Sequence, residues 1–66
     1  MFPNIEAERA RRGLTLDEFT AAIGVCRKTY YNWNALGKIP ENKVEAIARL
    51  FGVPTDYIEI YEEEQK

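Results

Sequence analysis

The chain lacks residue types that reactive and metal-binding sites commonly need. It has no histidine and a single cysteine, Cys26. One cysteine cannot form an internal disulfide, and without histidine the chain cannot assemble a zinc site of the usual thiolate and imidazole kind. No histidine is present to act as a base for the Cys26 thiol. We therefore expect no metal, no cofactor and no catalytic residue.

Long apolar runs are also missing. No stretch approaches the ~20 apolar residues that span a bilayer, and residues 1–4 have neither the basic start nor the apolar core of a signal peptide. We expect a cytoplasmic protein without a membrane partner. A chain of 66 residues forms one small domain that buries only ~60% of its unfolded surface, so an interior substrate pocket is not expected. The sequence points to no small-molecule ligand.

Positive charge is not in excess, since the formal net charge is −2. This balance argues against a nucleic-acid binder. The deficit, however, lies in the three glutamates at 62–64, because the eight basic and eight acidic residues before Tyr61 cancel. Basic residues lie on and beyond the segment 26–33, so we expect a local positive surface there. We divide the chain into a domain over residues 1–60 and an acidic tail over residues 61–66.

Glycine and proline divide the domain into helical segments. A first helix is expected from Asn4, as its N-cap, to Gly13. Residues 34–39 are expected to form a loop that ends at Pro40, followed by a helix to about Phe51 with Gly52 as its cap. A short last helix is expected from Pro54. The inward residues expected in the first and fourth helices are Ile5, Leu14, Val44, Ile47, Ala48 and Phe51, with Ala7 or Ala10 at a close helix contact.

The segment 16–35 carries the most information. Thr15 followed by Glu18 is the pattern of a capping box, which predicts that a helix starts at Thr15. Gly24 predicts a sharp turn, because glycine enters the left-handed conformation without steric cost. The fold class expected from the whole pattern is therefore all-α, with the helices on either side of Gly24 set at a steep angle. The side chains expected to face inward from these helices are Phe19, Ala22, Ile23, Val25, Tyr30 and Trp33.

Polar side chains lie on the opposite side of the helix that follows Gly24. Arginine and lysine can donate to guanine O6 and N7, and asparagine can pair with adenine N6 and N7. Arg27, Lys28 and Asn32 therefore have the chemistry and spacing of base-reading residues on a helix that enters the DNA major groove. Cys26 is interpreted mainly as a packing or capping substitute for serine, and a redox-sensitive contact to DNA is the alternative.

The segments Gly13-Leu14-Thr15, Gly24-Val25, Trp33 and 37–40 resemble the Cro and phage-repressor type of helix-turn-helix regulator, the xenobiotic-response-element-like family. The resemblance covers nearly all of residues 4–58. It implies a lambda-repressor-like DNA-binding domain, a compact bundle of four or five helices. In that pattern the second helix crosses the phosphate backbone and the third lies in the major groove. It also implies a homodimer on a near-palindromic operator, with no enzyme activity.

The family pattern indicates further contact positions and some departures. Leu16 stands where members commonly have a phosphate-contacting glutamine, and Asn34 replaces a common glutamate, so that Arg9 loses its expected carboxylate partner and is expected to bridge to Asn34. Arg9, Arg11 and Arg12 together are otherwise expected to form a solvated face. Additional possible DNA contacts are Cys26, Thr29, Tyr31, Leu16, Lys38 and Lys43. The apolar residues near the chain end are the expected dimer contacts: Tyr57, Ile58, Ile60 and Tyr61.

The sequence-based interpretation is a sequence-specific double-stranded DNA-binding protein, a transcriptional repressor of a bacterial, phage or mobile-element promoter. An alternative from another class is a protein-interaction module that has kept the helix-turn-helix fold and has weak or no DNA binding. The neutral charge of the domain and the apolar Leu16 favour this alternative, whereas Arg27, Lys28 and Asn32 argue against it. An enzyme ranks last, because the carboxylates lie at solvated helix starts and in the tail.

Overall fold

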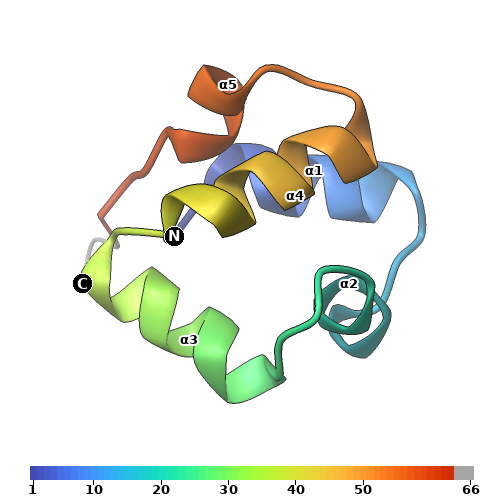
Figure 1. The fold of residues 1–66 in the computed structure, drawn as a ribbon, viewed down its shortest axis with the longest axis horizontal. Coiled ribbons are helices and arrows are strands. Elements are labelled where there is room, and N and C mark those ends of the chain that lie inside the picture. Colours follow the sequence, from blue (N-terminus) through green and yellow to red (C-terminus); the bar gives the residue numbers. More distant parts are fainter. Residues whose placement is uncertain (64–66) are drawn as a thin grey trace.

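The chain folds into α-helices joined by short connections (Figure 1). The computed structural model describes residues 1–63, and within that range it contains no β-strand. The all-helical expectation is therefore confirmed for this part of the chain. No helix in the same range has the length and apolar character needed to cross a membrane. The helices are α1 (Pro3–Arg11), α2 (Leu16–Ala22), α3 (Arg27–Leu36), α4 (Glu41–Phe51) and α5 (Thr55–Glu59).

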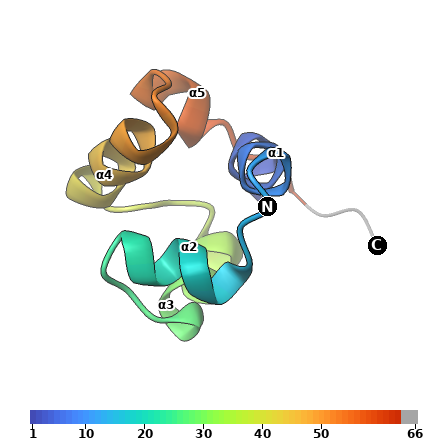
Figure 2. The same cartoon turned by 90° about the vertical axis from the view of Figure 1, so that its right-hand side faces the viewer.

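The helices are arranged around one core, with α2 and α3 on one side and α4 and α5 on the other (Figures 1 and 2). α2 packs against α3, α4 against α5, and α1 against α5. Figure 1 shows α2 nearly end-on while α3 runs across the view, so the two axes are steeply inclined, as expected. The buried apolar residues come from every helix and include Ile5, Phe19, Tyr30, Ile47 and Ile58.

The start of α2 and the turn after it follow from local sequence. The Glu18 N–H donates to the Thr15 hydroxyl at 3.1 Å, and the Thr15 N–H donates to the Glu18 carboxylate at 2.9 Å. This confirms the predicted capping box. The hydrogen bond from the Thr15 backbone lowers the pKa of Glu18. Gly24 has φ of +77°, in the left-handed region that glycine tolerates, and the chain turns there toward α3.

α4 is the longest of the described helices. Val44, Ile47, Ala48 and Phe51 are all buried, which confirms the periodicity predicted for this segment. Gly52 follows with φ of +69° and ends the helix as expected. α5 then supplies Ile58 to the core.

Both ends of α1 differ from the prediction. Phe2, not Asn4, occupies the N-cap position, and Pro3 is the first helical residue, where its missing N–H costs nothing. The Asn4 amide instead donates to the Tyr57 carbonyl oxygen at 2.9 Å, so it joins α1 to α5. The helix ends at Arg11 rather than at Gly13. Pattern alone could not distinguish a capping side chain from one used in a contact between helices.

Three expected inward positions are wrong, because Ala7, Ala10 and Ala22 are exposed. Leu14 and Val25 are partly buried and pack against the core, as expected. On α2, the buried neighbour of Phe19 is a polar residue: Thr20 donates its hydroxyl to the Leu16 carbonyl oxygen at 3.0 Å, which satisfies the buried group.

α3 is longer than expected. It continues through residues 34–36, which were predicted to be loop, and ends where Gly37 takes φ of +72°. Pro40 occupies the N-cap position of α4, one residue before the helix begins. The left-handed glycine, rather than the polar Asn34, therefore sets the end of α3.

Arg9 has a carboxylate partner after all, which corrects the expectation that it bridges to Asn34. Its guanidinium donates to Glu6 at 2.7 Å and to the Leu14 carbonyl oxygen at 2.9 Å. Tyr30 of α3 donates its hydroxyl to the same Glu6 carboxylate. Burial raises the pKa of Glu6, but the hydrogen bonds from Arg9 and Tyr30 outweigh it and leave the pKa lowered. The Asn34 amide donates to the Tyr30 carbonyl oxygen at 3.2 Å instead.

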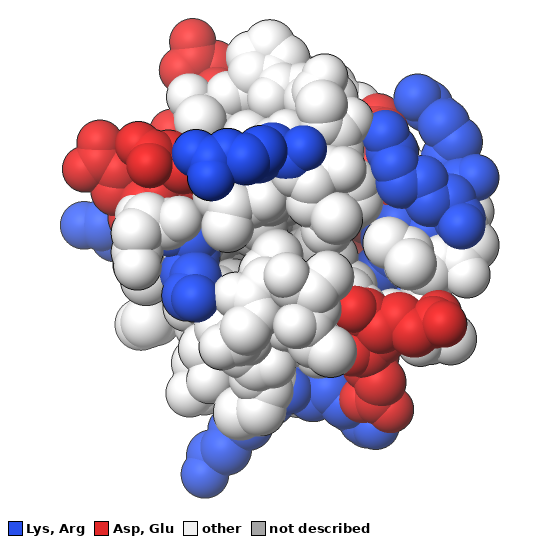
Figure 3. Space-filling view, turned by 45° about the vertical axis from the view of Figure 1, so that its right-hand side comes forward, with Lys and Arg blue, Asp and Glu red and all other residues white. Residues whose placement is uncertain are grey.

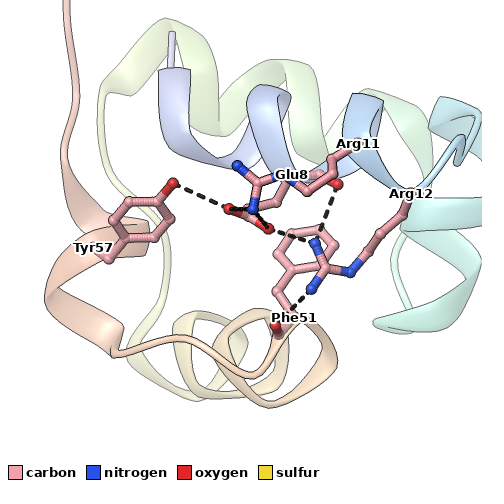
Figure 4. Close-up of polar contacts among 5 residues, drawn as sticks. All are labelled: Glu8, Arg11, Arg12, Phe51 and Tyr57. Carbon is pink, nitrogen blue, oxygen red and sulfur yellow. Dashed lines mark hydrogen bonds and ion pairs between the residues drawn. The ribbon is translucent and has the colours of Figure 1, made fainter.

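Glu8 is the other acidic group of α1 and is only 3% exposed (Figure 4). Arg12 donates to its carboxylate and, with its other terminal nitrogen, to the Phe51 carbonyl oxygen at 2.7 Å. Tyr57 of α5 donates its hydroxyl to Glu8 at 3.1 Å, and Arg11 forms an ion pair with it at 3.3 Å. The hydrogen bond from Arg12 lowers the pKa of Glu8 against the effect of burial. Arg11 and Arg12 are exposed, as the sequence predicts, but both are also ion-paired with Glu8, which the sequence did not predict.

Residues directly after residue 60, where the domain was expected to end, also contact the rest of the fold. The Tyr61 hydroxyl donates to the Asn34 carbonyl oxygen at 2.7 Å. The Glu62 N–H donates to the Met1 carbonyl oxygen at 2.9 Å. The first part of the expected acidic tail therefore packs against α3 and the N-terminal residues, and residues 64–66 lie outside the described residues.

The contacts of Glu8 lead to a prediction about pH. Glu8→Gln should lower the thermal midpoint, because a neutral amide loses the ion pairs with Arg11 and Arg12 while keeping its shape. The pKa of Glu8 lies below its ordinary value of 4.5 in the fold, so the carboxylate stabilises the fold above pH 4.5. That contribution falls as the pH drops further through the folded pKa. Thermal unfolding of parent and variant across a pH series measures the difference between their midpoints.

Glu45→Gln is the matched control, since Glu45 is exposed on α4. We expect it to leave stability almost unchanged at every pH. A Glu8→Gln effect no larger than that of the control, or one that does not shrink under acidic conditions, would show that the Glu8 contacts contribute little.

Candidate nucleic-acid interface

The two sides of α3 differ sharply in burial. Tyr30 and Trp33 are buried, which confirms their prediction as core residues. Arg27, Lys28 and Asn32 are exposed, as the sequence predicts. The helix therefore presents its polar side to solvent and uses only its aromatic side for packing.

The aromatic side of α3 is held by several groups. The Tyr30 ring meets Phe19 of α2 edge-on at 5.5 Å and Trp33 of the same helix at 6.3 Å. Burial raises the pKa of Tyr30, and its hydrogen bond to Glu6 raises it further. Tyr30 therefore stays neutral and keeps donating to Glu6. These contacts fix the position of α3 without using any of its outward side chains.

The outward side chains form two adjacent rows. Arg27 and Tyr31 are four residues apart, as are Lys28 and Asn32, so each pair shares one side of the helix. A hydrogen bond with Tyr31 contributes most to raising the pKa of Arg27, and the charge of Asp17 on α2 raises it further. The Arg27–Asp17 ion pair spans 3.5 Å, and both side chains are more than half exposed. Such a pair is weak and leaves the guanidinium able to take another partner. This role of Asp17 was not predictable from local sequence, because the contact joins separate helices.

Cys26 occupies the N-cap position of α3, where a capping residue was expected, but its side chain is exposed and forms no capping hydrogen bond, so it is not a packing residue. Its sulfur lies 3.3 Å from the Thr29 hydroxyl. This hydrogen bond, with contributions from nearby backbone groups, lowers the pKa of the Cys26 thiol. Thr29 is partly buried. Both residues lie at the first turn of α3, beside Arg27 and Lys28.

The two lysines expected to contact phosphate differ in their surroundings. Lys38 is exposed just after the end of α3, and no ion pair involves it among residues 1–63. Lys43 is partly buried and donates to the Ile23 carbonyl oxygen at 2.9 Å. It therefore caps the last turn of α2, a structural role that the sequence did not reveal. Leu16, at the start of α2, is partly buried against the core.

Charge on the molecular surface is mixed. On the face shown in Figure 3, basic and acidic groups alternate around a broad uncharged area. Several basic side chains are engaged within the fold: Arg9 with Glu6, and Arg11 and Arg12 with Glu8. Within residues 1–63, no group of three or more acidic or thiol side chains is placed so that it could hold a metal ion.

The expected dimer contacts are mostly occupied within the chain. Ile58 is 0% exposed and belongs to the core, so it is not available to a second copy, which corrects that expectation. The Tyr57 hydroxyl is bonded to Glu8, and Tyr61 packs edge-on against Phe2 at 5.0 Å. Ile60, at 49% exposure, is the one of these four residues that presents a largely free apolar side chain.

Comparison of the chain with protein-family models, curated proteins and solved structures finds no match.

The hydrogen bond between Cys26 and Thr29 can be tested without a ligand. Thr29→Val should raise the pKa of the Cys26 thiol toward its ordinary value of 9.0, because the hydroxyl that stabilises the thiolate is removed. The midpoint of the alkylation rate against pH, measured with iodoacetamide, should therefore move to higher pH. Thr55→Val, at the start of α5, is the control and should leave the midpoint in place. Equal midpoints in all three proteins would refute a role for Thr29.

Proposed function

We propose that this chain binds double-stranded DNA sequence-specifically, through a helix-turn-helix made of α2 and α3. The observation that carries the proposal is that Arg27, Lys28 and Asn32 are exposed on α3, whose other side packs in the core. We further propose a lambda-repressor-like domain that acts as a transcriptional repressor of a bacterial, phage or mobile-element promoter by occupying its operator.

The chemistry of these residues fits the major groove. An arginine or lysine pairs with guanine, and an asparagine pairs with adenine through two hydrogen bonds. In the proposed complex α3 lies in the groove with Arg27 and Lys28 at its leading turn, and α2 crosses the backbone. Tyr31, Thr29 and Cys26 flank the base-reading residues. Leu16 offers no hydrogen bond to phosphate, so the α2 contact is weaker than a glutamine would make.

The charge of the chain indicates how its affinity for DNA would be divided between phosphate contacts and base contacts. Phosphate neutralisation dominates nonspecific binding, and each neutralised phosphate adds to its salt dependence. With Arg9 and Arg12 engaged by carboxylates, fewer cations remain for phosphate. We therefore propose weak general affinity for DNA, with discrimination supplied by base contacts and by pairing of two copies.

A protein-interaction module is the second candidate function. It is favoured by Leu36, which is 78% exposed at the end of α3, and by Tyr31, which is 53% exposed. These apolar and aromatic groups would suit a protein partner as well as a DNA backbone. The DNA experiments below distinguish the two candidates.

Duplexes selected from a randomised pool provide the test of base reading. Arg27→Ala or Asn32→Ala should weaken binding to the selected duplex by ~1–3 kcal/mol and affect a scrambled duplex less, because base contacts provide discrimination. Titrations of folded variants measure both affinities. If neither variant loses affinity for the selected duplex, α3 does not read bases and the protein-interaction module replaces this proposal.

Lys38→Ala is the matched comparison for a phosphate contact. It should weaken both duplexes similarly and make the slope of log affinity against log salt shallower by ~1. Lys43→Ala, at the other lysine among the possible DNA contacts, is a poorer comparison. The Lys43 side chain donates to the Ile23 carbonyl oxygen, so this variant also loses a cap on α2.

We also propose a twofold dimer on DNA, with the two copies of α3 ~34 Å apart to match half-sites one helical turn apart. Ile60 is the main expected contact, with Tyr57 and Tyr61 beside it. Ile60→Lys should abolish cooperative binding without unfolding the chain, because the side chain is half exposed. Sedimentation and DNA titration measure this. Binding of single copies to one half-site without cooperativity, at every concentration of the parent protein, would contradict the dimer.

A further inference from the structure

Asp17 places a negative charge beside the side chains that are proposed to read bases. Its carboxylate accepts a hydrogen bond from Nη1 of Arg27 at 3.5 Å and so joins α2 to α3. The other ion pairs within residues 1–63 form within α1 or at its end. A carboxylate repels phosphate, so its place beside Arg27 affects how this arginine meets DNA.

The backbone that carries Asp17 has a fixed position relative to α3. Asp17 lies in the first turn of α2, directly after the capping box residue Thr15 and its neighbour Leu16. Two residues further on, Phe19 is fully buried and meets Tyr30 of α3 edge-on at 5.5 Å. The Asp17 side chain itself is 71% exposed. Packing between the helices therefore holds a solvent-facing carboxylate next to the first turn of α3.

The contact with Asp17 uses only part of the Arg27 guanidinium. A guanidinium has several N–H donors arranged as a planar fork. The Asp17 carboxylate accepts from Nη1, so this contact does not involve the edge formed by Nε and Nη2. Two parallel N–H groups of an arginine match the O6 and N7 acceptors of guanine. Arg27 can therefore pair with guanine while it still donates to Asp17.

Two partners orient the Arg27 side chain in the free protein. Asp17 is one, and Tyr31, on the same side of α3, is the other. An exposed ion pair is weak in water, so it orients the guanidinium without preventing a contact with a base. When DNA excludes water from the contact, the attraction between the two charges grows, because the effective dielectric constant falls. Asp17 therefore acts most strongly on Arg27 in the complex.

Asp17 also weakens the attraction between Arg27 and the DNA backbone. An arginine without an acidic neighbour neutralises phosphate in any sequence. Here a carboxylate offsets the charge of the guanidinium at 3.5 Å and repels phosphate. Guanine is uncharged and is not repelled in the same way. The ion pair therefore lowers the affinity of Arg27 for phosphate more than its affinity for guanine.

We propose that Asp17 is a specificity-determining residue that positions Arg27 for guanine and keeps it from phosphate. This role rests on the proposed DNA-binding function, and it names the base that Arg27 reads. Asp17 acts through Arg27 and needs no contact of its own with DNA.

Asp17→Asn removes the charge and keeps the shape of the side chain. Its affinity for a scrambled duplex should rise at least roughly twofold, and its slope of log affinity against log salt should become steeper by up to ~1. Its affinity for the selected duplex should rise less, so the ratio of the two affinities falls. Asp56→Asn is the matched control, because it removes the same charge from the first turn of α5. We expect it to keep the ratio of the parent.

A modified base tests the contact with guanine. 7-Deazaguanine lacks the N7 acceptor and replaces each guanine of the selected duplex in turn. One replacement should weaken binding of the parent about tenfold and should have little effect on Arg27→Ala, which has no guanidinium to pair with that base. The loss in Asp17→Asn should be intermediate, because the arginine is present but less well oriented. If no replacement gives this pattern, or if Asp17→Asn responds as the parent does, the proposal is overturned.

The titrations also separate the role of Asp17 from the proposed function. A parent that binds the selected duplex no better than a scrambled one overturns sequence-specific binding and the role of Asp17 together. A parent that discriminates, with the same affinity ratio in Asp17→Asn, overturns the role of Asp17 alone and leaves base reading by α3 in place. An equal fall of the ratio in Asp56→Asn also overturns it, because the effect would then belong to net charge.

Discussion

Packing around Phe19 is the contact on which the placement of α3 depends. The side chain is fully buried on α2, stacks against Phe51 of α4 at 5.7 Å, and meets Tyr30 of α3 edge-on at 5.5 Å. One ring thus joins three helices, and aromatic pairs in these geometries add stability beyond the area that they bury. Because Tyr30 and Trp33 occupy the inner side of α3, Arg27 and its neighbours point outward without contributing to the packing. Outward residues can therefore change with little effect on the fold.

α1 uses the same arrangement of polar groups twice. In each case a carboxylate on the helix accepts from an arginine in or directly after the helix and from a tyrosine hydroxyl on another helix. The two carboxylates are two residues apart, so they face nearly opposite sides of α1. One therefore secures α3 and the other α5. A 66-residue chain has little apolar surface to bury, and these satisfied polar contacts supplement its small core. The two sets are Glu6, Arg9 and Tyr30, and Glu8, Arg12 and Tyr57.

Sequence patterns predicted what depends on neighbours along the chain. The Thr15 and Glu18 capping box, the turn at Gly24 and the apolar periodicity of α4 are all local, and all were confirmed. Contacts between distant residues were not predictable in this way. Nothing local distinguishes the buried Glu8 from an exposed glutamate, and nothing local shows that Lys43 caps α2. The exposed side of α3 was predicted, because helical periodicity alone determines which of its residues face outward.

The internal use of arginine also bears on the proposed function. A DNA-binding surface commonly draws its affinity from cations that neutralise phosphate. Here the arginines of α1 are held by Glu6 and Glu8, and Lys43 by a backbone carbonyl group. The groups that stabilise the fold are thus withdrawn from the electrostatic attraction that binds any DNA sequence. Base contacts do not require a net positive surface, because they depend on the placement of donors and acceptors in the groove. Under the proposed function, the lack of net positive charge and the packing of α3 against the core would favour discrimination between sequences over general affinity.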